Sequence, residues 1–365
     1  MTKFAEDTTN KTEVTFLSSD PSCGLWGDLT LPSSHDGDES ESEKMPAIVI
    51  VAGSGPIDRN GNAPSLRLNL HTSDRFSDHV SRRRPERAIA VLSYDKRGVG
   101  KSQPVPKDKN FYYRAGMMDL VGDAVEAVRF AAGHPRIDKS RIVLLGHSEG
   151  AIILPLICRE VSKDDDLDPI SGCIFYSGFG ETLLDAMSLQ RETLLREVKE
   201  KTGPTGWVLR RVLTREKLEK QHDDFLKKVN GEDEPEFVTM HCGLVKQPAK
   251  WLREHIEYNV EGALEKHVTC HCLAITGQKD FQVRNEFCDA ERAATLVPNA
   301  KSIEAHRPEN LTHVLRSTEG PSRILEAKGE YAKMGKMPLD AELLEITDVW
   351  CDRVLFEERH NAPEQ

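Results

Sequence analysis

The chain has 365 residues, 30% of them charged and 38% hydrophobic, which suits a soluble globular protein with a sizeable core. Its formal net charge of -11 disfavours nucleic acids and acidic membranes as partners, because both would be repelled. No apolar run reaches the roughly eighteen residues of a transmembrane helix, and residues 1–16 lack the apolar centre of a signal peptide. We therefore expect a cytoplasmic protein without a transmembrane segment.

The first part of the chain predicts a flexible tail followed by two strands. Residues 1–11 form the expected tail. Residues 12–18 and 25–31 either alternate between apolar and polar side chains or form an apolar run, and both patterns are typical of strands. The acidic, small and polar stretch 33–44 then predicts a solvated loop.

Short apolar runs rich in β-branched residues follow, as in strands buried on both faces of a parallel sheet. Helical segments separate them; residues 119–132, for example, place Leu120, Ala124 and Val128 on one face. An apolar stripe in residues 341–358 predicts a last helix that packs on the sheet. This alternation predicts an α/β protein with a mostly parallel, doubly wound sheet. The expected strands of this part cover residues 47–52, 88–94, 142–145, 170–176, 272–276 and 302–305.

The alternation stops between residues 181 and 266, where the pattern is helical and highly charged. We expect a helical insertion, 181–266, within a core formed by residues 12–180 and 267–358. A cap or lid over the ligand site is its functional interpretation, and an inert decoration is the alternative. Three large apolar side chains of this segment either line an entrance to the site or pack within the cap: Trp207, Leu209 and Trp251.

The segment Gly146-His147-Ser148-Glu149-Gly150 matches the pattern G-x-S-x-G between a predicted strand and a predicted helix. In that context a sharp turn holds a serine nucleophile, and side chains at Gly146 and Gly150 would collide with the neighbouring strand and helix. Ser148 would then project its hydroxyl above the carboxyl end of the sheet, beside the N-terminus of the next helix. An ordinary strand-to-helix turn is the alternative.

A serine hydroxyl becomes a good nucleophile only when a base takes its proton, and in this chain order an acid and then a histidine should follow. Asp280 follows a predicted strand and is expected to orient the imidazole; a helix cap is its alternative role. His313 lies in a loop after the last predicted strand and is the expected base. The weaker rivals are Asp289, Glu286 and His306. The other histidines are interpreted as structural or surface residues: His147, His222, His241 and His255.

Attack on a carbonyl also needs donors for the oxygen that becomes negative. The loop Ala52-Gly53-Ser54-Gly55-Pro56 follows a predicted strand, and we assign this role to the backbone amides of Ser54 and Glu149. A plain turn is the alternative for the glycines. A phosphate-binding loop is disfavoured, because the G-x-G here lacks a third glycine and G-x-x-x-x-G-K-[ST] does not occur.

The cysteines do not indicate disulfides or a metal site. Eight are scattered along the chain, several of them in apolar runs, so we expect buried free thiols in a protein without an export signal. The dense group Cys270-His271-Cys272 offers zinc ligands. On a strand, however, the histidine would point away from both cysteines, and no second ligand pair is obvious. The apolar runs hold Cys158, Cys173 and Cys272.

Five segments resemble the α/β-hydrolase superfamily in kind and order: IVAGSGPIDRNGN, YDKRGVGKS, GHSEG, TGQKDFQV and NLTHVL. The first of them is similar to the esterase and serine-aminopeptidase-like branch. The resemblance spans residues 24–350 and is weakest in the middle. It implies the α/β-hydrolase fold with a variable cap after the sixth strand, Ser148 as nucleophile, Asp280 as acid and His313 as base. Ala52-Gly53 replaces the more common His-Gly, which leaves open the residue that supplies the first-loop amide.

These residues predict a serine hydrolase that cleaves a small carboxylic ester through an acyl-enzyme and needs no cofactor. A thioester or a small amide or aminoacyl bond would be cleaved by the same side chains. A non-catalytic binding protein with this fold is the alternative of a different class. Dehalogenases, epoxide hydrolases and dienelactone hydrolases are disfavoured, because Ser148 stands where they carry aspartate or cysteine.

Overall fold

The computed structural model describes residues 9–32, 44–64, 67–83, 85–231, 235–240 and 245–357. The predicted acidic loop apart from Lys44, the first eight residues of the predicted tail and His241 lie outside these ranges.

Eight strands form one central sheet in the order β1-β2-β4-β3-β5-β6-β9-β10. From β4 to β10 all neighbours are parallel, while β1 pairs antiparallel with β2, and β2 pairs antiparallel with β4. The mostly parallel sheet predicted from the apolar runs is confirmed. The strands are β1 (Thr9–Leu17), β2 (Gly24–Pro32), β3 (Met45–Val51), β4 (Ala90–Tyr94), β5 (Ile137–His147), β6 (Gly172–Tyr176), β9 (His271–Ile275) and β10 (Ser302–His306).

Two strands begin three or more residues earlier than predicted. β1 begins at Thr9, so the last three residues of the predicted tail pair with β2. β5 begins at Ile137, five residues before its apolar run, and an irregularity in the register lets Ile137 pair with Met45 of β3. The residues between are polar and partly exposed, so an apolar pattern could not reveal them.

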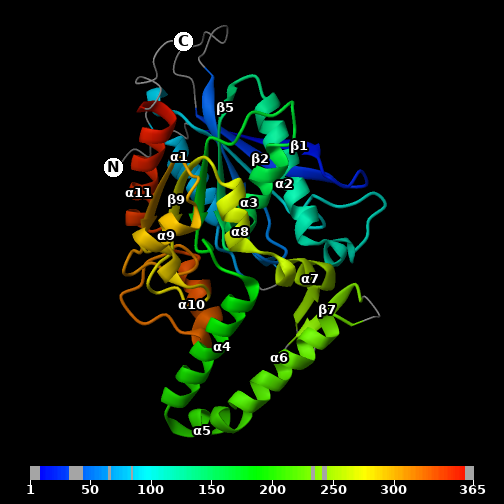
Figure 1. Cartoon of the computed structure of the whole chain (residues 1–365), viewed down its shortest axis with the longest axis vertical. Coiled ribbons are helices and arrows are strands. Elements are labelled where there is room, and N and C mark those ends of the chain that lie inside the picture. The colour runs from blue at the N-terminus through cyan, green and yellow to red at the C-terminus, as the bar shows by residue number, and fades with distance from the viewer. Residues whose placement is uncertain are drawn as a thin grey trace, which may run out of the picture.

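Helices cover both faces of the sheet (Figure 1). Alternate residues of the strands enter two cores, one on each face. Ala47, Val49 and Leu144 face the core covered by α2, α3, α8 and α9. Ile48 and Leu145 face the core covered by α1 and α11. The helices are α1 (Thr72–Ser81), α2 (Met117–Gly133), α3 (Glu149–Val161), α8 (Val260–His267), α9 (Ala290–Leu296), α10 (Ala327–Met334) and α11 (Ala341–Asp352), which continues into a π-helical turn, η6 (Arg353–Glu357).

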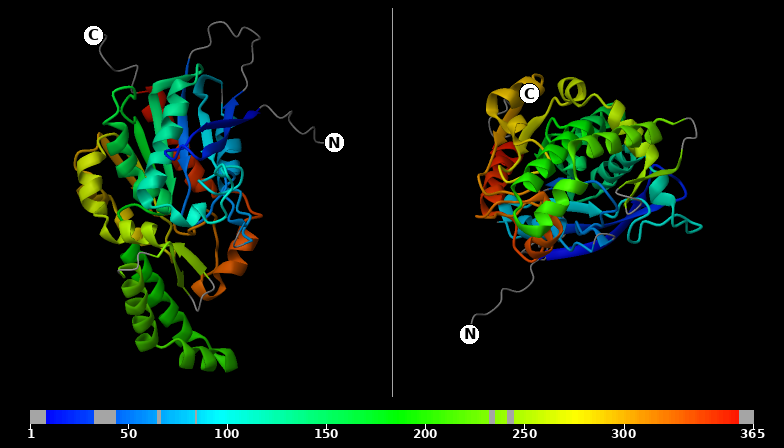
Figure 2. Two further views of the ribbon diagram at one scale, coloured as in Figure 1. Left: turned by 90° about the vertical axis from the view of Figure 1, so that its right-hand side faces the viewer. Right: turned by 90° about the horizontal axis from the view of Figure 1, so that it is seen from below.

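The segment after β6 forms a long helical projection (Figures 1 and 2). α4 (Leu183–Glu200) leads away from the sheet, α5 (Gly203–Val212) lies at the far end, and α6 (Arg215–Val229) returns. A two-stranded antiparallel ribbon, β7 (Phe237–Met240) and β8 (Val245–Pro248), precedes α7 (Ala249–Glu257). The ribbon was not predicted, because each strand has only four residues and no continuous apolar run.

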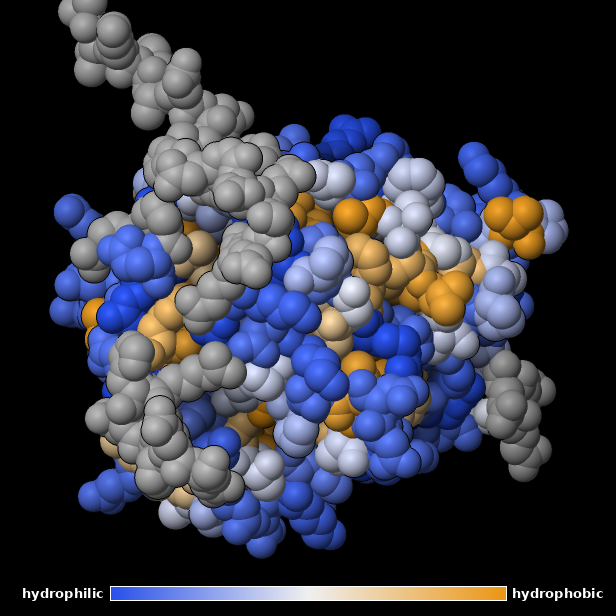
Figure 3. All heavy atoms as spheres, turned by 90° about the horizontal axis from the view of Figure 1, so that it is seen from above, coloured by the Kyte–Doolittle hydropathy of each residue, from blue (hydrophilic) through white to orange (hydrophobic). Residues whose placement is uncertain are grey.

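The surface matches the composition. Figure 3 shows that the face opposite the projecting helices is mainly hydrophilic, with apolar side chains in small groups. Among the helices of the described ranges, none has the length and hydropathy to cross a bilayer. The seven cysteines within the described ranges are buried and unpaired, as predicted.

Candidate active site

Ser148 occupies a strained turn between β5 and α3. Its φ of 56° and ψ of -121° lie outside the common regions for a residue with a side chain. A Cβ atom at Gly150 would lie 2.0 Å from the backbone oxygen of Val51, and one at Gly146 would lie 2.5 Å from the amide of Ala151. Both positions therefore need glycine for the reason predicted from the motif.

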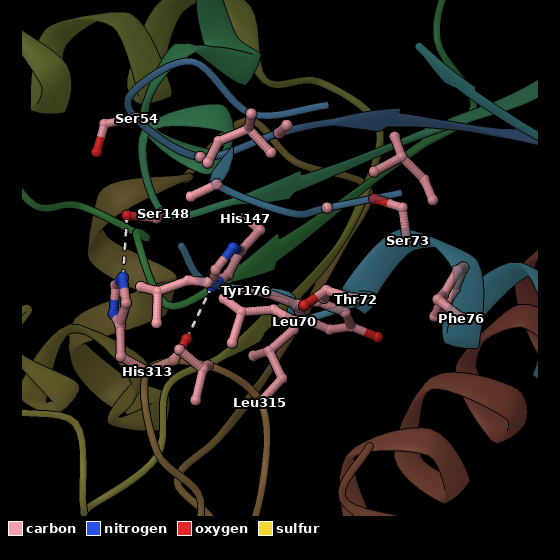
Figure 4. Close-up of a pocket in the computed structure, with 18 of the residues that line it drawn as sticks. Ser54, Leu70, Thr72, Ser73, Phe76, His147, Ser148, Tyr176, His313 and Leu315 are labelled. Atoms are coloured by element: carbon pink, nitrogen blue, oxygen red, sulfur yellow. Dashed lines mark hydrogen bonds between the residues drawn. The ribbon is translucent and has the colours of Figure 1, made fainter. Parts of the chain in front are cut away.

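Ser148, His313 and Asp280 form a hydrogen-bonded series. The Nε2 atom of His313 lies 3.1 Å from Ser148 Oγ (Figure 4). Its Nδ1 atom lies 2.8 Å from Asp280 Oδ2. A carboxylate accepts only, so Nδ1 carries the proton and Nε2 of the neutral ring is free to accept from the serine hydroxyl. The side chains of Asp280 and His313 are 0% and 7% exposed.

The loop at Asp280 is itself held by that carboxylate. Its Oδ1 atom accepts from the backbone N–H groups of Gln282 and Val283, at 2.8 and 3.2 Å. The second oxygen is thereby directed to His313. Three residues distant in sequence meet at this edge because β5, β9 and β10 are parallel and end there.

The three rival candidates for the acid and the base lie in other elements or contact other groups. Asp289 caps α9 by accepting from the amide of Glu291. Glu286 lies in the 3₁₀-helix η4 (Asn285–Cys288). His306 is within β10, with Nε2 3.8 Å from a carboxylate oxygen of Glu304. None of these contacts leads to Ser148.

The backbone amides assigned to the developing negative oxygen lie beside the serine. Ser54 follows β3 in the loop that passes Ser148: a Cβ atom at Gly53 would lie 3.2 Å from the Cβ of Ser148. Glu149 is the first residue of α3, where amides have no acceptor within the helix. In the described part of the chain neither the Ser54 amide nor the Glu149 amide donates to a protein group.

A cavity of about 190 Å³ opens beside Ser148 and His313 (Figure 4). Threonine, serine and glutamine side chains add a few neutral polar groups to its lining, and no carboxylate, lysine or arginine of the described ranges lines it. The cavity therefore fits an uncharged, mainly apolar group. Its apolar walls come from Ile50, Leu68, Leu70, Phe76, Leu145, Val314, Leu315 and Leu339.

His147 forms one wall of this cavity as a neutral ring. Burial, and next the nearby His313, lowers the pKa of His147 to about 4. Its Nε2 atom donates to the backbone oxygen of His313 at 2.8 Å. His147 thus holds the loop that carries His313. This contact defines the structural role that the sequence predicted for His147.

Comparisons with known proteins agree with this architecture. Residues 70–226 match a family described as "Serine aminopeptidase, S33". The chain is 27% identical to Esterase EstD of Thermotoga maritima over 314 residues. This alignment covers 86% of this chain and 62% of EstD. The chain thus spans less than two thirds of that relative.

Two solved structures share the fold at low sequence identity. A puromycin-hydrolysing peptidase of Mycobacterium tuberculosis has a TM-score of 0.53 and 14% identity, covering 98% of this chain and 41% of that one. The α/β hydrolase GrgF of a Penicillium species has a TM-score of 0.50 and 12% identity, covering 95% and 99%. The chain has the α/β-hydrolase fold. Its sequence is esterase-like, while the first-loop motif on which the finer resemblance depended stays a prediction.

The segment between β6 and β9 contributes unequally to the surroundings of Ser148. Trp251 of α7 is buried and donates its indole N–H to Glu149, directly after the serine. Trp207 is 53% exposed on α5, at the far end of the projection, and Leu209 is half-buried there. His255 of α7 is buried against Trp251.

The structure brings together a group of cysteines that differs from the sequence group Cys270-His271-Cys272. Cys270 gathers with Cys158 and Cys173, with Sγ atoms within 4.8 Å of one another. His271 points elsewhere, with Nδ1 2.9 Å from Ser302 Oγ. The two additional thiols come from α3 and β6, so only the packing of those elements reveals the group.

Glu181, where the projecting segment leaves the core, should make stability depend on pH. It is fully buried and accepts from the backbone N–H of Arg284 at 2.6 Å. Burial raises its pKa from 4.5 to about 7. Below pH 4.5 the carboxyl group is protonated in both states, and its raised pKa costs no stability. Between pH 4.5 and 7 only the unfolded state ionises, so the free energy of unfolding falls as the pH rises, and the full cost is reached above pH 7.

Glu181→Gln is therefore expected to raise the free energy of unfolding by about 2 kcal/mol at pH 8, and by much less at pH 4.5. Urea unfolding of both proteins at the two pH values measures this. Asp185→Asn is the control, because Asp185 pairs with the same Arg284 at 3.0 Å and its pKa is lowered, chiefly by Thr182. A gain for Glu181→Gln that is equal at both pH values would contradict the prediction.

Proposed function

We propose that the protein is a serine hydrolase that cleaves small, uncharged carboxylic esters. The observation that carries the proposal is the imidazole of His313, which bonds to Ser148 on one side and Asp280 on the other. That arrangement supplies a nucleophile, a base and a group that fixes the tautomer of the base.

In the proposed reaction, Ser148 Oγ attacks the carbonyl carbon while its proton passes to Nε2 of His313. Asp280 stabilises the resulting imidazolium, and the amides of Ser54 and Glu149 donate to the oxygen that becomes negative. The imidazolium then protonates the alcohol as the carbon–oxygen bond breaks, which leaves an ester on Ser148. Water, deprotonated by the same imidazole, releases the acid and restores the serine, without a cofactor.

The insertion, residues 181–266, is proposed to act as a cap on a core formed by residues 12–180 and 267–358. The contact between Trp251 of α7 and Glu149 supports this role, because it joins the insertion to the residue after the nucleophile. The long α4–α6 projection makes no such contact within the described residues. We therefore assign the cap function to the part that contains α7.

The second candidate is an aminoacyl or small amide bond, which the family description and the peptidase neighbour favour. The cavity argues against it. An α-ammonium group needs a carboxylate partner when buried, and no described carboxylate lines the cavity. A thioester remains chemically equivalent to an ester on the same residues.

A matched substrate pair tests the proposal. Methyl butyrate and methyl 2-aminobutyrate differ only by the ammonium group, and kcat/KM for methyl butyrate is expected to be about a hundredfold higher or more. A pH-stat measures both, and a fluorophosphonate adduct mapped by mass spectrometry should lie on Ser148. Faster cleavage of the aminoacyl ester would favour the second candidate, and folded protein that cleaves neither ester and takes no label would favour a binding protein.

A further inference from the structure

Lys96, part of a charged turn in the sequence, is buried beside the loop after β3. It is the second residue after β4, and its side chain is only 6% exposed. Its ammonium donates to the backbone oxygen of Gly53 at 2.6 Å and to Glu149 Oε2 at 3.0 Å. These two acceptors belong to the two segments that carry the proposed oxyanion donors, so one side chain joins both segments.

The contact with Gly53 bears directly on the amide of Ser54, because the two residues share one peptide unit. The C=O of Gly53 and the N–H of Ser54 lie in one plane and point in opposite directions across the trans bond. An ammonium that holds the oxygen therefore sets the direction of the N–H. A cation on the oxygen also polarises the peptide unit, which strengthens the N–H as a donor.

Glu149 is held by further partners from the insertion. Its carboxylate is buried, accepts from the indole N–H of Trp251, and lies 3.6 Å from Nε2 of His255. Burial alone would raise the pKa of Glu149, but the Lys96 ammonium and the other neighbours hold it below its ordinary value. The carboxylate therefore stays charged, and α7 braces the residue that follows the nucleophile.

Stability alone is a poor explanation for this ion pair. Desolvation of two buried charges offsets most of their attraction, so an apolar pair of similar volume would stabilise the fold as well. The same turn carries a second buried pair, Arg97 with Asp123, whose atoms are 2.6 Å apart. The hydrogen bonds of Arg97 go to α2 and to the loop after β1, not to the first loop or to the start of α3.

We propose that Lys96 is a positioning residue for the oxyanion hole: it orients the Ser54 amide through the Gly53 carbonyl and ties it to Glu149. The inference rests on the proposed function, since an oxyanion forms only if Ser148 attacks a carbonyl.

The test removes the ion pair as a unit in Lys96→Met/Glu149→Gln. The new amide oxygen at position 149 can still accept from Trp251, so no charge is left buried alone. We expect kcat for methyl butyrate to fall about tenfold to a hundredfold, with KM changed less than about threefold, because the oxyanion exists only after attack. Affinity for an alkyl trifluoromethyl ketone, which forms an oxyanion adduct with serine, should fall by a similar factor.

Arg97→Met/Asp123→Asn is the matched control, because it removes a buried ion pair from the same turn. It is expected to change the melting temperature but not the ratio of ketone affinity to KM. Glu149→Gln alone, which leaves Lys96 on Gly53, should lose less activity than the double variant and provides a second measurement should the double variant not fold.

The outcomes separate the two proposals. Equal losses in the Lys96 and Arg97 double variants, or unchanged kcat in the folded Lys96 variant, would contradict the positioning role and leave ester hydrolysis by Ser148 intact. Wild-type protein that cleaves no ester and takes no fluorophosphonate label would contradict the proposed function, and this inference with it.

Discussion

Ser148→Ala is expected to lower kcat for methyl butyrate by about 10⁴-fold or more, because the residual rate then comes only from binding and the oxyanion donors. The substitution removes the hydroxyl that bonds to His313 at 3.1 Å and leaves the imidazole and Asp280 in place. Steady-state kinetics on the purified variant measure the loss, and fluorophosphonate labelling should disappear with it.

Ser177→Ala is the matched control for that substitution. Ser177 follows β6, the strand next to β5, is fully buried, and its hydroxyl has no hydrogen-bond partner within the described residues. Its removal should keep kcat within about twofold, because an unpartnered buried hydroxyl contributes little. Ester hydrolysis that persists in folded Ser148→Ala would assign the activity to another residue.

Asp280→Asn is expected to lower kcat by about 10⁴-fold near neutral pH, with little change in KM. The asparagine oxygen can still accept from the amides of Gln282 and Val283, so the loop should keep its shape. The remaining NH₂ group, however, faces Nδ1 of His313, which then has to accept. Nε2 would consequently carry the proton and could no longer take one from Ser148.

Asp289→Asn is the control for Asp280→Asn, because Asp289 was the rival carboxylate and caps α9. It should keep kcat within about twofold and change stability little, because asparagine caps a helix about as well as aspartate. Circular dichroism verifies the fold of both variants. A folded Asp280→Asn variant within tenfold of wild-type kcat would exclude Asp280 as the orienting acid.

The sequence predicted the strands of the central sheet and its mostly parallel character. All eight predicted strands occur. The runs of β3, β4, β6 and β9 are almost entirely buried and therefore carry a strong local signal. The strained turn at Ser148 was equally predictable from its glycine spacing. The close approach of Val51 to Gly150 leaves no room for a side chain, so the turn requires glycine there. His313 lies within hydrogen-bond distance of Ser148, and Asp280 within hydrogen-bond distance of His313, because the parallel strands end at one edge of the sheet.

Other features had no local signal. The start of β5 and the ribbon of β7 and β8 depend on pairing with distant or short strands, and their residues are not continuously apolar. The sequence gives Lys96 and Glu149 as ordinary charged residues, 53 positions apart. Their burial appears only when β4, α3 and α7 pack together.

The sequence by itself determined the α/β class, the strained turn at Ser148 and the identity of the acid and base candidates, because apolar runs, glycine spacing and strand order are local or sequential properties. Only the tertiary structure decided what surrounds them. The uncharged cavity, the neutral wall formed by His147 and the buried bridge from Lys96 to Gly53 and Glu149 arise from contacts between distant segments. Burial changes the energetics of a charge far more than its position in the sequence does, and burial is a property of packing.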